Sequence, residues 1–213
     1  FLLKWALHPE IIGTRQNNMK IIGITGGIGS GKTAVLNILK SDYGAFVMEA
    51  DVLAHCLMKP GQMSYNDIVN AFGQDILMED GAIDRQKLGQ VVFNDEEKLK
   101  ILNSITHPNV KKAILSSIEE KEIAGCDLYV LEAALLIQDG YLDICDEMWF
   151  VYADLEKRIE RLCMYRGFTR ERAAKVIRSQ APDEYYEMNC VKKIDNSGDI
   201  DELKKQISIA MQI

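Results

Sequence analysis

Short runs of apolar residues, each stopped by glycine or by polar residues, recur along the chain and predict five β-strands. The first is KIIGIT at residues 20–25, and the second, AFVMEA, ends directly before Asp51. The others are LYVLEA at residues 128–133, EMWFVYA at 147–153 and the weaker VKKIDN at 191–196. Continuous apolar runs of this length are typical of parallel strands that are buried on both faces.

Helical spacing of apolar residues separates most of these runs. The segment TAVLNILKSDYG carries Val35, Leu36 and Leu39 at helical spacing, and Gly44 is placed to end this helix. Strands that alternate with helices predict an α/β fold, in which helices cover both faces of a parallel sheet.

Two segments depart from this alternation. Residues 60–125 show mainly helical spacing, as in RQKLGQVVF and EKLKILNSI, which is too long for one crossover and predicts an inserted helical subdomain. Residues 154–189 form the second anomaly, because 6 of the 8 arginines of the chain fall between positions 154 and 180. The nucleotide-binding core would then comprise residues 19–59, 126–153 and 190–213.

Composition and charge narrow the class of protein. The chain has 213 residues, of which 47% are hydrophobic, and no apolar run of roughly 18 residues that could span a bilayer. A net charge of -7 argues against nucleic acid as the partner. The five cysteines are widely spaced and lack a metal-binding pattern, which is typical of reduced thiols, so we expect a cytoplasmic protein. We also expect a monomer, with a homo-oligomer as the alternative.

The start of the chain does not fit this pattern. Met19 stands directly before the first predicted strand, and Lys4 and His8 interrupt the apolar run that precedes it, so a secretory signal is not expected. We interpret residues 1–18 as a non-native or disordered extension; a short docking helix is the alternative.

The stretch GITGGIGSGKT carries the strongest chemical signal. It matches the pattern G-x-x-x-x-G-K-[ST] and lies between a predicted strand and a predicted helix, as a P-loop requires. Glycines let backbone N–H groups surround the phosphates of ATP, Lys32 would reach the β- and γ-phosphates, and the Thr33 hydroxyl would ligate Mg²⁺. The predicted ATP-binding residues here are Gly27, Gly29, Ser30, Gly31, Lys32, Thr33 and Ala34. The fold class is therefore a P-loop NTPase-type sheet.

Two acidic residues are predicted to face this loop. Asp51 and Glu132 follow the second and third strands, and the carboxyl ends of parallel strands open onto one crevice. Asp51 is the candidate general base for an attacking hydroxyl, with a helix cap as the alternative. Glu132 is a candidate Mg²⁺ ligand, and an ordinary surface acid is the alternative.

The arginine segment predicts a lid. Arg158, Arg161 and Tyr165 share one helical face, and Leu155, Ile159 and Leu162 form the apolar one. A solvated charged helix would explain this pattern, but arginine's planar fork suits bidentate contacts to phosphate, which favours the lid of a phosphotransferase.

Together these motifs make the chain similar to the dephospho-coenzyme A kinase family. The resemblance covers residues 20 to about 207 and rests on the P-loop, on EADVLAH, on GAIDRQKLGQVVF followed by ITHP, on RLCMYRGFTRERAAKVIRSQ and on DNSG. The resemblance implies an ATP- and Mg²⁺-dependent kinase that phosphorylates the 3'-hydroxyl of dephospho-coenzyme A, a small-molecule partner.

The resemblance also implies residue roles. Asp51 takes the position of the catalytic aspartate, Arg161 and Arg166 match lid positions, and Asn196 matches a residue near the adenine. The 60–125 insertion would bind the coenzyme A moiety through Arg85 and His107, although each residue taken alone is better explained by a structural role.

Departures from the family pattern keep rival functions open. Where the family usually has D-x-P-L-L-F-E, this chain has EAALLIQ at residues 132–138, with Ala134 and Gln138 in place of proline and glutamate. Val191 stands where the family has an aspartate. The rivals are a nucleoside or nucleotide kinase and a catalytically weak nucleotide-binding regulator. A GTPase is disfavoured, because the chain has no N-K-x-D guanine-reading pattern.

Overall fold

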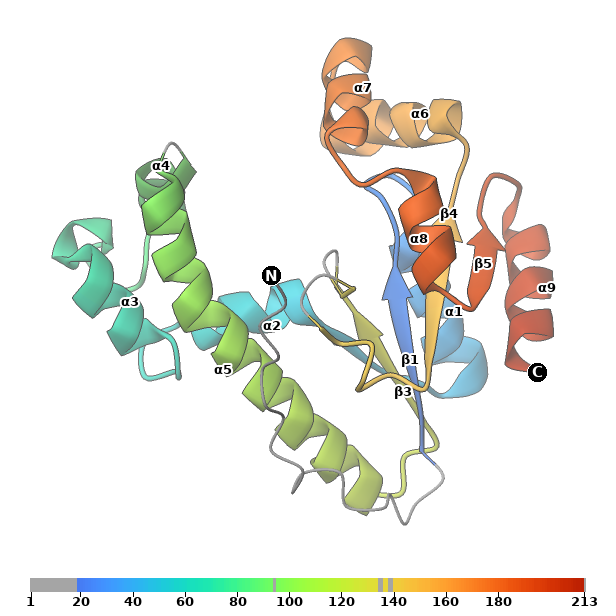
Figure 1. Cartoon of the computed structure of the whole chain (residues 1–213), viewed down its shortest axis with the longest axis horizontal. Helices are drawn as coiled ribbons and strands as arrows, with labels where there is room; N and C mark the ends of the chain where they lie inside the picture. Colours follow the sequence, from blue (N-terminus) through green and yellow to red (C-terminus); the bar gives the residue numbers. More distant parts are fainter. Residues whose placement is uncertain (1–18, 94, 134–135, 138–139, 213) are drawn as a thin grey trace, which may run out of the picture.

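All five predicted strands form in the computed structural model, which describes residues 19–93, 95–133, 136–137 and 140–212. The strands are β1 (Lys20–Thr25), β2 (Phe46–Glu49), β3 (Leu128–Glu132), β4 (Glu147–Tyr152) and β5 (Lys192–Asp195). They build one sheet with the order β2-β3-β1-β4-β5, and every pair is parallel (Figure 1). The interpretation of residues 1–18 concerns a segment outside the described residues.

Helices follow or precede each strand. They are α1 (Lys32–Tyr43), α2 (Ala50–Leu57), α3 (Tyr65–Phe72), the 3₁₀ turn η1 (Gln74–Ile76), α4 (Arg85–Phe93), α5 (Glu96–Ile123), α6 (Leu155–Arg166), α7 (Arg170–Arg178), α8 (Asp183–Asn189) and α9 (Ile200–Met211). None of the described helices is long and apolar enough to cross a membrane.

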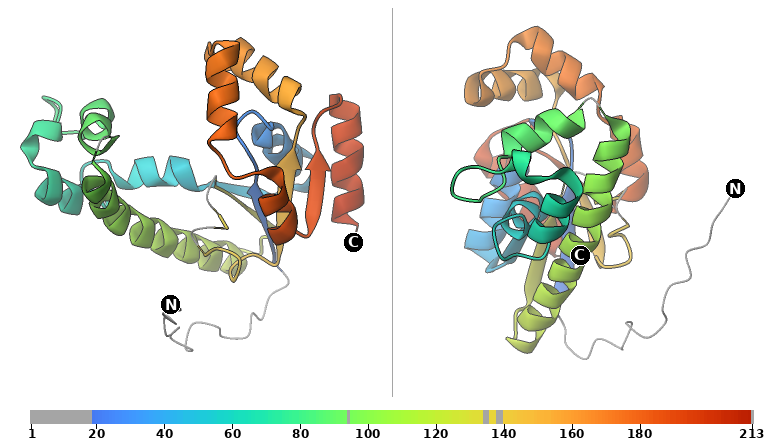
Figure 2. Two further views of the ribbon diagram at one scale, coloured as in Figure 1. Left: turned by 45° about the horizontal axis from the view of Figure 1, so that its top comes forward. Right: turned by 90° about the vertical axis from the view of Figure 1, so that its left-hand side faces the viewer.

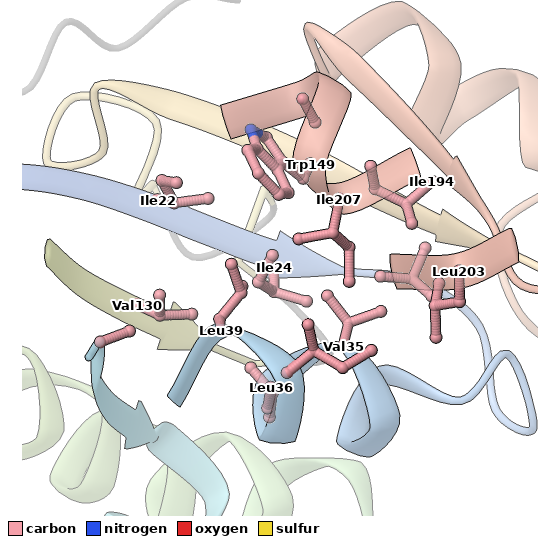
Figure 3. Packing of buried hydrophobic residues seen from close by; sticks show 14 of the residues in the cluster. Ile22, Ile24, Val35, Leu36, Leu39, Val130, Trp149, Ile194, Leu203 and Ile207 are labelled. Atoms are coloured by element: carbon pink, nitrogen blue, oxygen red, sulfur yellow. The ribbon is translucent and has the colours of Figure 1, made fainter. Parts of the chain in front are cut away.

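One face of the sheet is covered by α1 and α9. Alternate residues of the central strands, such as Ile22, Val130 and Trp149, point to this face and pack against Leu39 and Ile207 from the two helices (Figure 3). Gly44, in the left-handed conformation with φ 67°, ends α1 as predicted. The packing of α1 on this face holds the start of the helix next to the carboxyl end of β1.

The opposite face is covered mainly by α2 and α5. Tyr129 and Leu131 of β3, together with Met148 of β4, pack here against Ile114 and other apolar residues. The central strands β1, β3 and β4 read as nearly continuous apolar runs because both of their faces are buried.

The segment 60–125 forms a helical unit with its own core. Ile68, Ile76 and Leu88 are buried there, and an isolated antiparallel bridge joins Leu77 to Ile83. The long helix α5 serves both units, because its first half packs on this core and its second half packs on the sheet. In Figures 1 and 2 this unit stands to one side of the sheet, and in Figure 1 α6 and α7 lie above the sheet.

The two lid helices share a small core of their own. Ile159, Leu162, Ala173 and Ile177 are buried between α6 and α7. The predicted apolar face is correct at Ile159 and Leu162 and wrong at Leu155, which is 52% exposed and is not part of the core that the two helices share.

Candidate active site

The stretch between β1 and α1 has the geometry of a phosphate-binding loop. Gly29 and Gly31 adopt φ values of 79° and 89°, which only glycine adopts without strain. A side chain is also excluded at Gly31 by space, because an added Cβ would lie 2.1 Å from Nδ2 of Asn196. The loop leads directly into the N-terminus of α1, where the helix dipole favours anions.

Lys32 lies at the first position of α1 and points back over the loop. Its Nζ donates a hydrogen bond to the carbonyl oxygen of Gly26 at 3.0 Å and lies 3.5 Å from Oε1 of Glu132. Burial raises the pKa of the Glu132 carboxyl, Asp51 and Glu49 raise it further, and Lys32 counteracts part of the shift. One carbonyl oxygen and one carboxylate therefore hold the lysine beside the loop.

Three carboxylates gather at the carboxyl edge of the sheet. Glu49 and Glu132 end the neighbouring strands β2 and β3 and are paired in register, and Asp51 follows in the first turn of α2. The N-cap of α2 is Glu49, so the alternative of Asp51 as the helix cap does not describe this structure. Glu132 is buried, and Asp51 is exposed toward the cleft. Glu49 was not predicted as a site residue, although it is the first residue of the EADVLAH motif.

Two of the lid arginines contact the loop instead of solvent. Arg161 donates to the carbonyl oxygens of Ser30 at 3.1 Å and Asn196 at 2.8 Å, and Arg158 is 7% exposed, with its Nε 2.9 Å from the carbonyl oxygen of Ile28. The solvated charged helix is thus excluded for these two arginines. Arg166 lies at the end of α6 and is exposed.

Asn196, which follows β5, is also tied to the loop. It is buried, and its side-chain amide donates to the carbonyl oxygen of Ser30 at 2.8 Å. Ser30 is itself buried, and its hydroxyl has no hydrogen-bond partner among the described residues. The DNSG motif therefore supports the loop from the side of β5.

These elements enclose a cleft of about 740 Å³. Most of the predicted site residues line it: Gly27, Gly29, Gly31, Lys32, Thr33, Ala34, Asp51, Glu132, Arg161, Arg166 and Asn196. Tyr165 and Gln180 line it as well, and no sequence pattern had singled out Gln180. Ser30, although part of the loop, is not among the lining residues.

The two predicted substrate-side residues, Arg85 and His107, do not line this cleft. Both belong to the helical insertion, at the start of α4 and within α5. Arg85 nevertheless lies close enough to α2 to act on it, because burial and then the Arg85 charge lower the pKa of His55, one turn beyond Asp51. Ala134 and Gln138, two of the departures from the family pattern, lie outside the described residues.

A P-loop at the carboxyl edge of a parallel sheet, facing acidic residues and covered by an arginine-bearing helical lid, defines the class of P-loop phosphotransferases. Comparison with known proteins places the chain within that class. Residues 20–202 match the family model described as dephospho-CoA kinase, so the chain belongs to the dephospho-CoA kinase family.

Individual relatives agree with this family assignment. The chain is 42% identical over 194 residues to a dephospho-CoA kinase of Carboxydothermus hydrogenoformans, covering 91% of this chain and 94% of the relative. It is 41% identical to the dephospho-CoA kinase of Geobacter sulfurreducens, with 89% and 95% covered. The crystal structure of a Thermus thermophilus protein superimposes with a TM-score of 0.78 at 29% identity and covers 92% of this chain and 97% of that one.

Proposed function

We propose that the chain transfers the γ-phosphoryl group of ATP to the 3'-hydroxyl of dephospho-coenzyme A, giving coenzyme A and ADP in the final step of coenzyme A biosynthesis. The observation that carries this proposal is that the P-loop lysine and Asp51 line one cleft in a member of this family. An acidic residue beside the γ-phosphate position is what transfer to an alcohol requires.

Different residues of the chain have different roles in this reaction. The loop N–H groups and Lys32 hold the β- and γ-phosphates, and Asp51 accepts the proton of the attacking hydroxyl. Arg161 and Arg166 line the lid side of the cleft, where guanidinium groups neutralise the charge of the transferring group. Asn196 orients the nucleotide from the edge of the loop. Catalysis rests mainly on positioning and on charge stabilisation, because phosphoryl transfer needs little covalent help from the protein.

The donor atoms around Lys32 suit Mg²⁺ bound together with ATP. The Thr33 hydroxyl and the carboxylates of Glu132 and Asp51 are oxygen donors in one cleft, which is the chemistry that Mg²⁺ prefers. Within the described residues no group of three acidic, histidine or cysteine side chains could hold a metal alone. Mg²⁺ would therefore be held largely by ATP phosphates and water, and when bound it would neutralise phosphate charge.

The helical insertion is the proposed binding surface for the rest of the acceptor. It occupies roughly 65 residues, far more than the dozen or so that a crossover needs. Arg85 and His107 are the residues through which we expect it to contact the coenzyme A moiety. We expect the enzyme to work in the cytoplasm, as a monomer with a homo-oligomer as the alternative.

A panel of acceptors tests this proposal. ADP release is measured by a coupled assay with dephospho-coenzyme A, AMP, deoxycytidine and adenosine at one ATP concentration. Dephospho-coenzyme A should exceed the others in kcat/KM by several orders of magnitude, because its remote contacts help to orient the hydroxyl. AMP or a nucleoside as the best acceptor would favour a nucleotide kinase, and no transfer to any acceptor would favour the nucleotide-binding regulator.

A further inference from the structure

The residue in the middle of the phosphate-binding loop, Ile28, is attached to the lid at three points. Its side chain packs against the small core that α6 and α7 share. Its N–H donates to Oε1 of Gln180 at 2.7 Å, and its carbonyl oxygen accepts from Nε of Arg158 at 2.9 Å. Both polar groups of this residue's backbone are therefore bound by lid side chains.

The two lid residues also bind each other. Nη2 of Arg158 donates to the same Oε1 of Gln180 at 3.1 Å, which closes a ring of hydrogen bonds through Ile28. Burial lowers the pKa of the Arg158 guanidinium, and Asp183, whose Oδ1 lies 3.7 Å from Nη1, counteracts this shift. The arginine stays charged, because a guanidinium group keeps its proton far above neutral pH.

The loop sequence is adapted to this contact. A Cβ added at Gly27 would lie 2.1 Å from Nη2 of Arg158, and one added at Gly29 would lie 2.9 Å from the carbonyl oxygen of Arg158. These two glycines thus give room to α6 as well as to phosphate. The contact also removes the Ile28 N–H from the set that can face a phosphate, because that N–H already has its acceptor in Gln180.

We propose that Arg158 and Gln180 are positioning residues that hold the Ile28 peptide to the lid and thereby fix the phosphate-binding conformation of the loop. This inference rests on the proposed use of ATP. It gives Arg158 and Gln180 a role that does not depend on contact with the substrate. Neither residue needs to touch the reacting atoms. A loop that carries an unfixed Ile28 peptide would have to be ordered by the nucleotide itself, which lowers affinity.

Gln180→Leu is the test, because leucine has a similar size and removes the acceptor of two hydrogen bonds. Affinity for MgADP, measured by isothermal titration calorimetry without any acceptor substrate, should fall about 10- to 100-fold, the range expected when buried donors lose their partner. KM for ATP should rise similarly, and KM for dephospho-coenzyme A should stay within about threefold, because the insertion is untouched.

Two further variants separate positioning from a merely structural role. Gln180→Glu keeps an oxygen for both donors, and its added charge lies beside the Arg158 guanidinium, so it should lose less MgADP affinity than Gln180→Leu. Arg178→Lys, an exposed change two residues earlier in the lid, should leave affinity unchanged. If Gln180→Leu does not fold, Gln180→Asn, whose shorter side chain withdraws the same amide, should weaken binding in the same direction.

The outcomes are distinct from those that test the proposed function. Equal MgADP affinity in Gln180→Leu and the unmutated chain, with only a lower melting temperature, would overturn the positioning role. An unmutated chain that binds MgADP but transfers phosphate to no acceptor would refute the kinase proposal and leave the positioning role to be judged on binding alone. Equal losses of MgADP affinity in Gln180→Leu and Gln180→Glu would also refute the positioning role, since Gln180→Glu keeps the hydrogen-bond acceptor.

Discussion

Gly31→Ala should damage nucleotide binding in a way that the structure allows us to estimate. Gly31 is the N-cap of α1 with φ 89°, and an added Cβ would lie 2.1 Å from Nδ2 of Asn196. The left-handed conformation costs a non-glycine residue about 1–2 kcal/mol, and losing the hydrogen bond from Asn196 to Ser30 costs about 1 kcal/mol. A loss of about 2–3 kcal/mol within the loop corresponds to about 30- to 150-fold weaker MgATP binding.

The same helix supplies a matched control. Gly44 at the C-cap of α1 also has a positive φ, 67°, but a Cβ added there meets nothing within 4 Å. Gly44→Ala should lower the melting temperature through backbone strain and leave MgATP affinity unchanged. Calorimetric titration with a non-hydrolysable ATP analogue, together with thermal unfolding, compares the two variants. Analogue affinity in Gly31→Ala within about twofold of the unmutated chain would refute the claim that close packing of Asn196 shapes this loop.

Two further predictions concern an acid in the cleft and one at the far end of the sheet. Asp51→Asn should lower kcat roughly 100-fold or more while MgATP affinity stays within about threefold, because the variant removes a general base and no phosphate contact; unchanged kcat would remove Asp51 from catalysis. The pKa of Glu147 is held at about 2: partial burial raises it, but hydrogen bonds from Lys20, Trp149 and Lys192 lower it more. Because the pKa of Glu147 is lower in the folded than in the unfolded chain, its ionised carboxylate stabilises the fold fully above the unfolded pKa. This stabilisation is lost as pH falls from about 4.5 to about 2. At pH 7 the free energy of unfolding of Glu147→Gln should therefore be about 1–2 kcal/mol lower than that of the unmutated chain, after allowance for solvent screening. Urea titrations should show this difference vanishing near pH 2, and a pH-independent difference would contradict the prediction.

The strands and the phosphate site could be predicted because their signals are local. The β-branched run before the loop gave β1 to the residue, and the glycine pattern fixed the turn into α1. Asp51 and Glu132 were placed in one crevice by a general property of parallel sheets, and both line the cleft. These inferences needed no knowledge of which helix packs on which.

The partners of the arginines could not be predicted, because helical spacing assigns a residue to a face but does not say what that face meets. Arg158 was expected on a polar face, yet it is buried against the carbonyl oxygen of Ile28, which is 130 residues away in sequence. Gln180 gave no signal, since a single glutamine after a helix has no characteristic pattern. The register of Glu49 beside Glu132 likewise depended on the pairing of β2 with β3.

The most direct test of the account is the identity of the product. The unmutated chain is incubated with dephospho-coenzyme A, MgCl₂ and ATP labelled at the γ-phosphate, and the product is analysed by phosphorus NMR and mass spectrometry. The proposed reaction gives one labelled phosphomonoester on the ribose 3'-hydroxyl of the acceptor, formed in a one-to-one ratio with ADP. Label released as inorganic phosphate, or carried on any other position of the acceptor, would contradict it.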